Sequence, residues 1–179
     1  MADQNTMETV TGAENSTDSV GGSGSKAPAT PTLLMGAQYI RSVSFKALDS
    51  ALLHTRPPVR PNTALTLDVM ARQVAENQPD FEVDVVMNCV GHGDKPVDGS
   101  EAPTLFETQI TYSGMFTLRN VTTESFEPML LVDAPKMLFP AARNYLADLT
   151  REAGFIPVII QQIDFLALWQ SRRSQPAAG

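Results

Sequence analysis

The sequence predicts an α+β fold, in which a four-stranded antiparallel sheet is followed by a long helix, an apolar crossover and a second C-terminal helix. Apolar and polar residues alternate in four segments between residues 38 and 118, and turn-forming residues separate these segments. From residue 133 onwards, apolar residues instead recur at intervals of three and four. Strands that come first, with helices afterwards, indicate an α+β domain.

The composition predicts one globular domain with a tail at each end. The chain has 179 residues, 42% of them hydrophobic, and a net charge of −7. Residues 1–37 are rich in Gly, Ser, Thr and Pro and lack apolar periodicity, so we expect a disordered tail. We assign residues 38–171 to the folded domain and residues 172–179 to a short disordered C-terminal tail.

Several broad classes of protein do not fit this chain. The N-terminus lacks the basic and apolar regions of a secretory signal, and no apolar run has the length of a membrane span. The single cysteine, Cys89, excludes an internal disulfide and indicates a reducing compartment. We therefore expect a cytoplasmic protein without membrane insertion. The acidic balance argues against nucleic-acid binding and favours basic partners.

The first strand is predicted from Gln38 to Phe45. Strict alternation divides its side chains into two sets, which are Tyr39, Arg41, Val43 and Phe45 on one side and Ile40, Ser42 and Ser44 on the other. The next segment contains Pro57, Pro58 and Pro61, which exclude a central strand or a helix interior. We expect a loop or an extended edge segment there.

The other three strands are predicted at residues 64–74, 81–90 and 104–118. Their apolar sides are Leu65, Leu67, Val69 and Ala71 in the second strand, Phe81, Val83, Val85, Met87 and Cys89 in the third, and Phe106, Ile110, Tyr112 and Phe116 in the fourth. A Gly/Pro/Asp-rich segment predicts a long exposed loop between the last two strands. Turn-like connections throughout predict an antiparallel meander.

The long helix is predicted to begin at Asp133 as its N-cap and to end at Gly154. A shorter helical stretch precedes it, capped by Thr122 or Thr123. The apolar stripe of the long helix consists of Leu138, Ala142, Tyr145 and Leu149. Pro140 has no backbone N–H, which predicts either a kink or a helix that starts later.

The crossover after this helix is unusually apolar. Residues 155–163 contain six large apolar side chains, and Pro157 prevents a regular helix that would bury all of them on one face. Phe165 and Trp169 add large apolar surface on the last helix. These residues form ordinary core or, with aromatic residues of the fourth strand such as Phe106, the wall of a groove for extended peptide.

Nothing in the sequence favours catalysis. The two histidines, His54 and His92, and the single cysteine are too few and too scattered for a structured metal site. The motifs of hydrolases, zinc proteases and nucleotide-binding proteins do not occur. Acidic residues on the strands alternate with apolar ones, which favours a solvated sheet face over paired catalytic carboxylates. We expect no enzyme activity, no metal and no cofactor.

The chain from about Gln38 to Trp169 resembles the SecB family of bacterial protein-export chaperones. The similarity rests on YIRSVSF in the first strand, LTLD in the second, FEV in the third and LFETQITYSGMF in the fourth. The segments APKMLFPAARNYL and GFIPVIIQQIDFLALW are the most specific ones. The N-terminal tail lies outside the resemblance.

The resemblance implies a chaperone that holds unfolded preproteins without ATP and passes them to the translocation motor SecA. It implies a homotetramer assembled as a dimer of dimers, whose long helix carries the oligomer-interface residues Leu138, Ala142, Tyr145 and Leu149. The implied peptide-binding groove consists of Leu65, Leu67, Phe106, Ile156, Val158, Ile160, Phe165 and Trp169.

The chain departs from the family pattern at two places. The position before the second strand that is commonly aromatic is Val59. The positions that the family uses for SecA docking, where it carries acidic residues, are Ser42, Lys46 and Gln109. Glu107 shares a strand face with Gln109 and can partly replace the acidic charge that is missing at the docking positions. These departures put SecA docking in question.

Three hypotheses therefore stand. The first is a holdase that keeps preproteins competent for translocation and delivers them to SecA. The second is a SecB-like chaperone dedicated to one client, such as an antitoxin, and not coupled to SecA. The third is a small-molecule-binding or enzymatic α+β domain that uses the same groove, for which no catalytic constellation is present.

Overall fold

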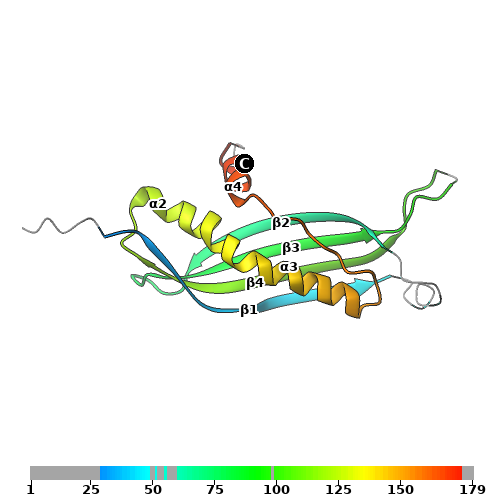
Figure 1. The fold of residues 1–179 in the computed structure, drawn as a ribbon, viewed down its shortest axis with the longest axis horizontal. Coiled ribbons are helices and arrows are strands. Elements are labelled where there is room, and N and C mark those ends of the chain that lie inside the picture. The colour runs from blue at the N-terminus through cyan, green and yellow to red at the C-terminus, as the bar shows by residue number, and fades with distance from the viewer. Residues whose placement is uncertain (1–28, 49–50, 52–54, 56–59, 98, 175–179) are drawn as a thin grey trace, which may run out of the picture.

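The computed structural model describes residues 29–48, 51, 55, 60–97 and 99–174 (Figure 1). The elements are β1 (Thr32–Ala47), β2 (Asn62–Gln73), β3 (Asp80–His92), β4 (Thr104–Arg119), α2 (Thr123–Pro128), a π-helical turn η1 (Met129–Asp133), α3 (Ala134–Glu152) and α4 (Phe165–Ser174). The predicted α+β fold is confirmed. Of the tails predicted as disordered, residues 1–28 and 175–179 lie outside the described residues, as do His54, Pro57, Pro58 and Val59.

The sheet has the order β1-β4-β3-β2, and all three neighbouring pairs are antiparallel. The prediction of a simple meander is therefore wrong, because β1 lies beside β4 and not beside β2. Residues 48–61 connect β1 to β2, and a connection of that length does not impose the neighbour pairing of a tight hairpin. As a result, β1 and β2 form the two edges of the sheet.

Strand β1 differs from its predicted limits and faces. It begins at Thr32, so residues 32–37 belong to the sheet and not to the tail. Its register with β4 shifts between Ile40 and Ser42, which indicates a β-bulge at Arg41. Because of the bulge, Arg41 and Tyr39 reach the same face as Asp84 and Glu82, whereas Val43 lies opposite Ile110 on the other face. The predicted division of the β1 side chains by strict alternation, which placed Tyr39, Arg41 and Val43 on one side, is therefore wrong.

The two faces of the sheet have different surroundings (Figure 1). The helix face, covered by α3, carries the apolar sides predicted for β3 and β4, which are buried apart from the half-buried Tyr112. Of the side predicted for β2, Val69 is buried, Leu65 and Leu67 are half-buried, and Ala71 is exposed. The open face carries the alternate residues, including Glu82, Asp84 and Ser113. Gly114 permits close approach of the helix, because a Cβ atom there would lie 2.5 Å from Cδ2 of Leu138. Leu138 and Ala142 are fully buried against the sheet.

The helical part is one run of 30 residues, from Thr123 to Glu152. Thr122 is its N-cap, and the Thr122 hydroxyl accepts from the Ser125 N–H at 3.3 Å. The N-cap predicted at Asp133 is wrong, since Asp133 has helical backbone angles and caps nothing. Helix α3 continues through Pro140, so a later start is also wrong, and Gly154 ends it at φ +88°. Helix α4 extends to Ser174, past the predicted boundary at residue 171.

A buried carboxylate joins the four strands on the open face. Asp84 on β3 has no exposed surface, and its carboxylate accepts from Arg41 of β1 at 2.7 Å, Arg72 of β2 at 2.8 Å and Ser113 of β4 at 2.6 Å. Burial alone would raise the pKa of Asp84. The hydrogen bonds from Ser113 and Arg72 and the charges of both arginines outweigh burial and lower that pKa below its ordinary value.

We expect Asp84→Asn to reduce the free energy of unfolding by about 3 kcal/mol at pH 7, because it leaves two half-exposed guanidinium groups beside a neutral amide. Urea denaturation at a fixed protein concentration measures this loss. Because the native pKa is depressed, the stabilisation by Asp84 is complete above about pH 4 and is lost as the pH falls through the native value. The difference between the two proteins should therefore shrink at low pH.

Asp148→Asn is the matched control. Asp148 forms an exposed ion pair with Arg151 at 3.1 Å on α3, and its removal should cost less than about 0.5 kcal/mol. Equal losses for both variants would show that Asp84 does not join the strands.

Candidate functional site

The crossover, residues 155–164, has no regular secondary structure and is held to the end of α3 by a buried threonine. The Thr150 hydroxyl donates to the Leu146 carbonyl at 2.9 Å and accepts from the Val158 N–H at 3.1 Å. Thr150 and Val158 are both buried. One side chain therefore satisfies a buried N–H that the extended chain would otherwise leave unpaired.

Three aromatic rings fix the start of the crossover on the helix face. The Phe106 ring stacks on Phe45 at a centroid distance of 5.3 Å and lies 5.0 Å from the Phe155 ring. Gly91 makes room for Phe106, because a Cβ atom there would lie 2.2 Å from that ring. Phe106 has no exposed surface. It positions the crossover and offers no surface to a ligand.

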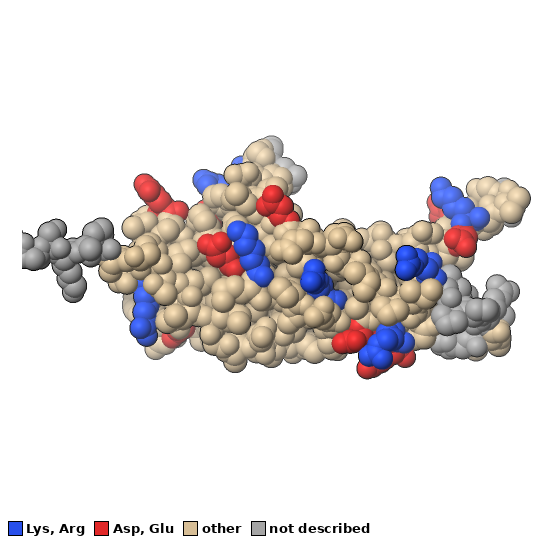
Figure 2. Space-filling view, in the orientation of Figure 1, with Lys and Arg blue, Asp and Glu red and all other residues tan. Residues whose placement is uncertain are grey.

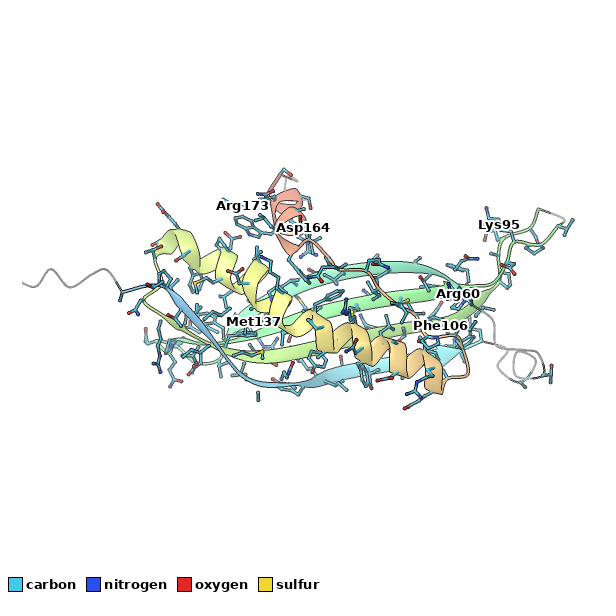
Figure 3. The ribbon with its side chains drawn as sticks, viewed as in Figure 1. Arg60, Lys95, Phe106, Met137, Asp164 and Arg173 are labelled. Carbon is cyan, nitrogen blue, oxygen red and sulfur yellow. The ribbon has the colours of Figure 1, made fainter. Side chains whose placement is uncertain are left out.

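A first hollow of about 270 Å³ lies between the start of β2 and the crossover. Its lining residues are Arg60, Pro61, Thr63, Ile156, Pro157, Val158, Ile159 and Gln161. The Ile159 side chain is 73% exposed, which is high for a large apolar residue. Figure 3 shows Arg60 and Phe106 toward the same end of the molecule. Ile156 in the lining directly follows Phe155, one of the three aromatic rings, in the chain.

A second hollow of about 250 Å³ lies between β2, η1 and α4. It is lined by Val69, Glu127, Leu131, Leu168, Trp169, Arg172 and Arg173. The Trp169 indole N–H donates to Glu127 at 3.0 Å, and the Arg173 guanidinium lies 4.9 Å from the centre of the Trp169 ring. Figure 3 labels Arg173 on α4 and Asp164 immediately before that helix. The walls of the second hollow are apolar and its rim is charged.

The predicted groove residues divide into two groups. Phe106, Val158 and Phe165 are buried in the core. The other five, Leu65, Leu67, Ile156, Ile160 and Trp169, are half-buried. Ile156 lines the first hollow and Trp169 the second, whereas Leu65 and Leu67 lie on the helix face of β2. The structure therefore gives two hollows along β2 and the crossover.

The residues assigned to SecA docking come together on the open face. Ser42, Lys46, Glu107 and Gln109 are all exposed there, and Lys46 lies directly opposite Glu107 in the sheet register. A shallow hollow of about 450 Å³ includes Lys46, Glu107 and Gln109. Opposite charges face each other, so this surface is not an acidic one.

The residues assigned to the oligomer interface are only partly accessible. Leu138 and Ala142 are core residues without exposed surface, so their assignment to a contact with another chain is wrong. Helix α3 rotates them toward the sheet at Gly114. Tyr145 and Leu149 are half-buried at the margin of the core. The exposed apolar residues nearby are Met35, Ile40 and Val43 on β1 and Met137 on α3.

Cys89 is the only cysteine of the chain and is buried. Burial raises the pKa of the Cys89 thiol to about 11, so the reactive thiolate is scarce at neutral pH. No three His, Cys, Asp or Glu side chains gather as a metal site within the described residues. In the same part of the chain, no helix is long and apolar enough to cross a membrane.

Sequence reasoning missed the polar residues that hold the crossover and α4. Thr150 follows Leu146 by one helical turn on the buried face, and this spacing was the available signal. Glu127 and Arg172 carry no comparable signal, because their partners lie 42 and 105 residues away in the chain. Only the folded structure brings such distant residues together.

Comparison with known proteins gives consistent results. The model of the family described as preprotein translocase subunit SecB matches residues 26–176. The protein-export protein SecB of Granulibacter bethesdensis is 41% identical over 82% of this chain and 85% of its own. Protein-export protein SecB 1 of Gluconobacter oxydans is 35% identical over 91% of this chain and 94% of its own.

A solved structure has a similar fold. It is a SecB-like chaperone of Mycobacterium tuberculosis in complex with a peptide from the HigA1 antitoxin. The TM-score is 0.57 and the identity 12%, with 73% of this chain and 90% of the other covered. At this identity the likeness concerns the fold.

We expect Thr150→Val to release the crossover from α3, because the Val158 N–H loses its acceptor in a buried place. The free energy of unfolding should fall by about 1–3 kcal/mol. Hydrogen exchange at the Val158 amide should accelerate, as measured by NMR. Thr150→Ser keeps the hydroxyl and should retain most of the protection. Unchanged exchange in the valine variant would contradict this role.

Proposed function

The chain belongs to the SecB family, and on that basis we propose that it is an ATP-independent holdase of the cytoplasm. It binds unfolded preproteins, keeps them competent for translocation and delivers them to the SecA motor. The observation that carries this proposal is the 73% exposed side chain of Ile159 at the first hollow, which the half-buried Ile156 also lines, on a crossover that Thr150 holds to α3. An unfolded client has apolar segments that such a surface can cover.

The geometry supports holding without a chemical step. Two separate hollows lie along the same edge of the molecule, and each is small enough for one or two client side chains. Several weak contacts on one client give a high combined affinity, and the loss of one contact makes the others easier to release. Neither nucleotide nor metal is required for binding of this kind.

We further propose a homotetramer built as a dimer of dimers. Edge strand β1 exposes large apolar side chains on both faces, with Leu34 and Tyr39 on the open face and Ile40 and Val43 on the helix face. Figure 2 shows wide uncharged areas between scattered charges on the side that carries α3. Long, apolar and unpaired edges are normally covered by another chain. Met137 on α3 extends this surface.

A second candidate is a chaperone that serves one dedicated client, such as an antitoxin, without SecA. The charge pattern of the open face favours it, since Lys46 faces Glu107 where an acidic docking surface would attract a basic partner. The fold neighbour from Mycobacterium tuberculosis binds an antitoxin peptide. Binding of SecA distinguishes the two candidates.

We expect Ile159→Asn to weaken binding of an unfolded client about five- to tenfold, because it removes an exposed apolar side chain from the first hollow. Reduced, carboxamidomethylated α-lactalbumin serves as a permanently unfolded client, and fluorescence anisotropy measures its dissociation constant without nucleotide. The free energy of unfolding should change by less than about 0.5 kcal/mol, since the side chain is exposed.

Val97→Asn is the matched control, because Val97 is fully exposed on the β3–β4 loop and lines neither hollow. It should leave client binding unchanged. If Ile159→Asn binds as tightly as the natural protein, the first hollow is not the client site. Phe106→Ala is unsuitable for this test because the ring is buried and its removal destabilises the fold.

We expect Lys46→Glu to strengthen binding of SecA severalfold, because it restores negative charge beside Glu107 on the open face. The gain should decrease with rising salt concentration. Surface plasmon resonance measures it, and light scattering in parallel should show an unchanged tetramer. Lys95→Glu makes the same change in net charge on the β3–β4 loop (Figure 3), outside the hollow that Lys46 and Glu107 line, and should have no effect. A natural protein and a variant that both fail to bind SecA would favour the dedicated chaperone.

A further inference from the structure

The free edge of β2 has an uneven pattern of hydrogen bonding. In an antiparallel edge strand, every second residue directs both its N–H and its C=O away from the neighbouring strand. The register of β2 with β3 is continuous from Asn62 to Gln73, so this alternation holds along the whole strand. The outward contacts of Leu67 and Val69 identify the odd-numbered residues as the outward set.

Two side chains close the middle of this edge. The Asp68 carboxylate accepts from the Val69 N–H at 2.7 Å, and Arg172 of α4 donates to the Leu67 carbonyl at 3.0 Å. Arg172 also pairs with Asp68 at 2.5 Å. An ion pair with this exposure is weak by itself, but each partner here also satisfies a backbone group. An added strand would have to displace both side chains.

The edge is open on the N-terminal side of this pair. By the same alternation, Thr63 and Leu65 direct their N–H and C=O groups outward, and among the residues that the structure describes no group bonds to them. Thr63 lines the first hollow together with Ile156 and Ile159 of the crossover. Unpaired backbone groups therefore lie beside an exposed apolar surface, which is the combination used in strand addition.

We propose that the Asp68–Arg172 pair is a stop, which limits backbone pairing of an extended client to the Asn62–Thr66 part of β2. The inference rests on the proposed function, because its occupant is a segment of an unfolded client. The segment adds as a strand at Thr63 and Leu65 and places apolar side chains in the first hollow. Pairing ends at Leu67, where side chains already occupy the backbone groups.

The test is the set of β2 amides that a bound client protects from hydrogen exchange, measured by NMR on the full chain. Reduced, carboxamidomethylated α-lactalbumin is the probe. In the natural protein, the client should slow exchange at Thr63 and Leu65 about tenfold or more and leave Leu67 and Val69 unchanged. In the variant Asp68→Ala/Arg172→Ala, which removes both the acceptor of the Val69 N–H and the donor to the Leu67 carbonyl, protection should extend to Leu67 and Val69, and client release should slow more than tenfold.

Two further variants define the effect. Arg172→Ala alone frees the Leu67 carbonyl but leaves Asp68 on the Val69 N–H, so it should give an intermediate release rate. Asp148→Ala/Arg151→Ala removes an exposed ion pair of 3.1 Å on α3 with the same change of charges. This control should leave the protected amides unchanged.

The outcomes separate this inference from the proposed function. Absence of client binding to the natural protein would overturn both. Client binding without protection of Thr63 and Leu65 overturns the inference and leaves the proposed function standing. The same protected amides in the natural protein and the double variant would show that the pair is no stop. Light scattering could instead detect assembly of the double variant with rising concentration while the client protects no additional β2 amides. That result would show that the edge binds a second copy of the chain.

Discussion

The packing of Leu138 on Gly114 determines how closely the long helix lies against the sheet, and much of the remaining structure depends on it. The side chain occupies the space that a Cβ atom of residue 114 would fill. One helical run thereby covers the helix face, and no element among the described residues covers the open face. The open face is held by ion pairs and hydrogen bonds between its own side chains. Asp84 accepts from three strands there without leaving a buried polar atom unpaired in the described part of the chain.

The two edge strands of the sheet differ in their exposed side chains, and this difference bears on which partner each edge can bind. Strand β1 exposes apolar side chains on both faces, which suits a permanent contact with another copy. Strand β2 is polar at its middle, where Asp68 and Arg172 satisfy its backbone groups. A chaperone whose two edge strands both had exposed apolar side chains and unpaired backbone groups would pair with other copies at both edges. Closing part of β2 with charged side chains keeps that edge for a transient partner.

Most of the fold follows from local patterns, whereas the site depends on contacts between distant residues. Alternation located the buried faces of β3 and β4 and the helix-facing side of β2, of which only Val69 is buried, because continuous register preserves a period of two. It failed on β1, where the bulge at Arg41 turns that side chain toward Asp84 of another strand. Helical spacing identified Leu138 and Ala142 as apolar but not as core, since a stripe does not say what covers it. Phe106 was assigned to a groove because alternation on β4 marks it as apolar but does not show what covers it.

The strength of client binding has to remain moderate if the client is to be passed on, and the β2 edge offers a physical reason why it does. A backbone hydrogen bond contributes about 0.5–1.5 kcal/mol net. In the arrangement that we propose, Thr63 and Leu65 supply few such bonds, and the first hollow accepts a client side chain or two beside Ile159. Pairing at Leu67 and Val69 as well would roughly double the backbone contribution and slow release more than tenfold. The charged pair on this edge therefore favours turnover of the client over tight retention.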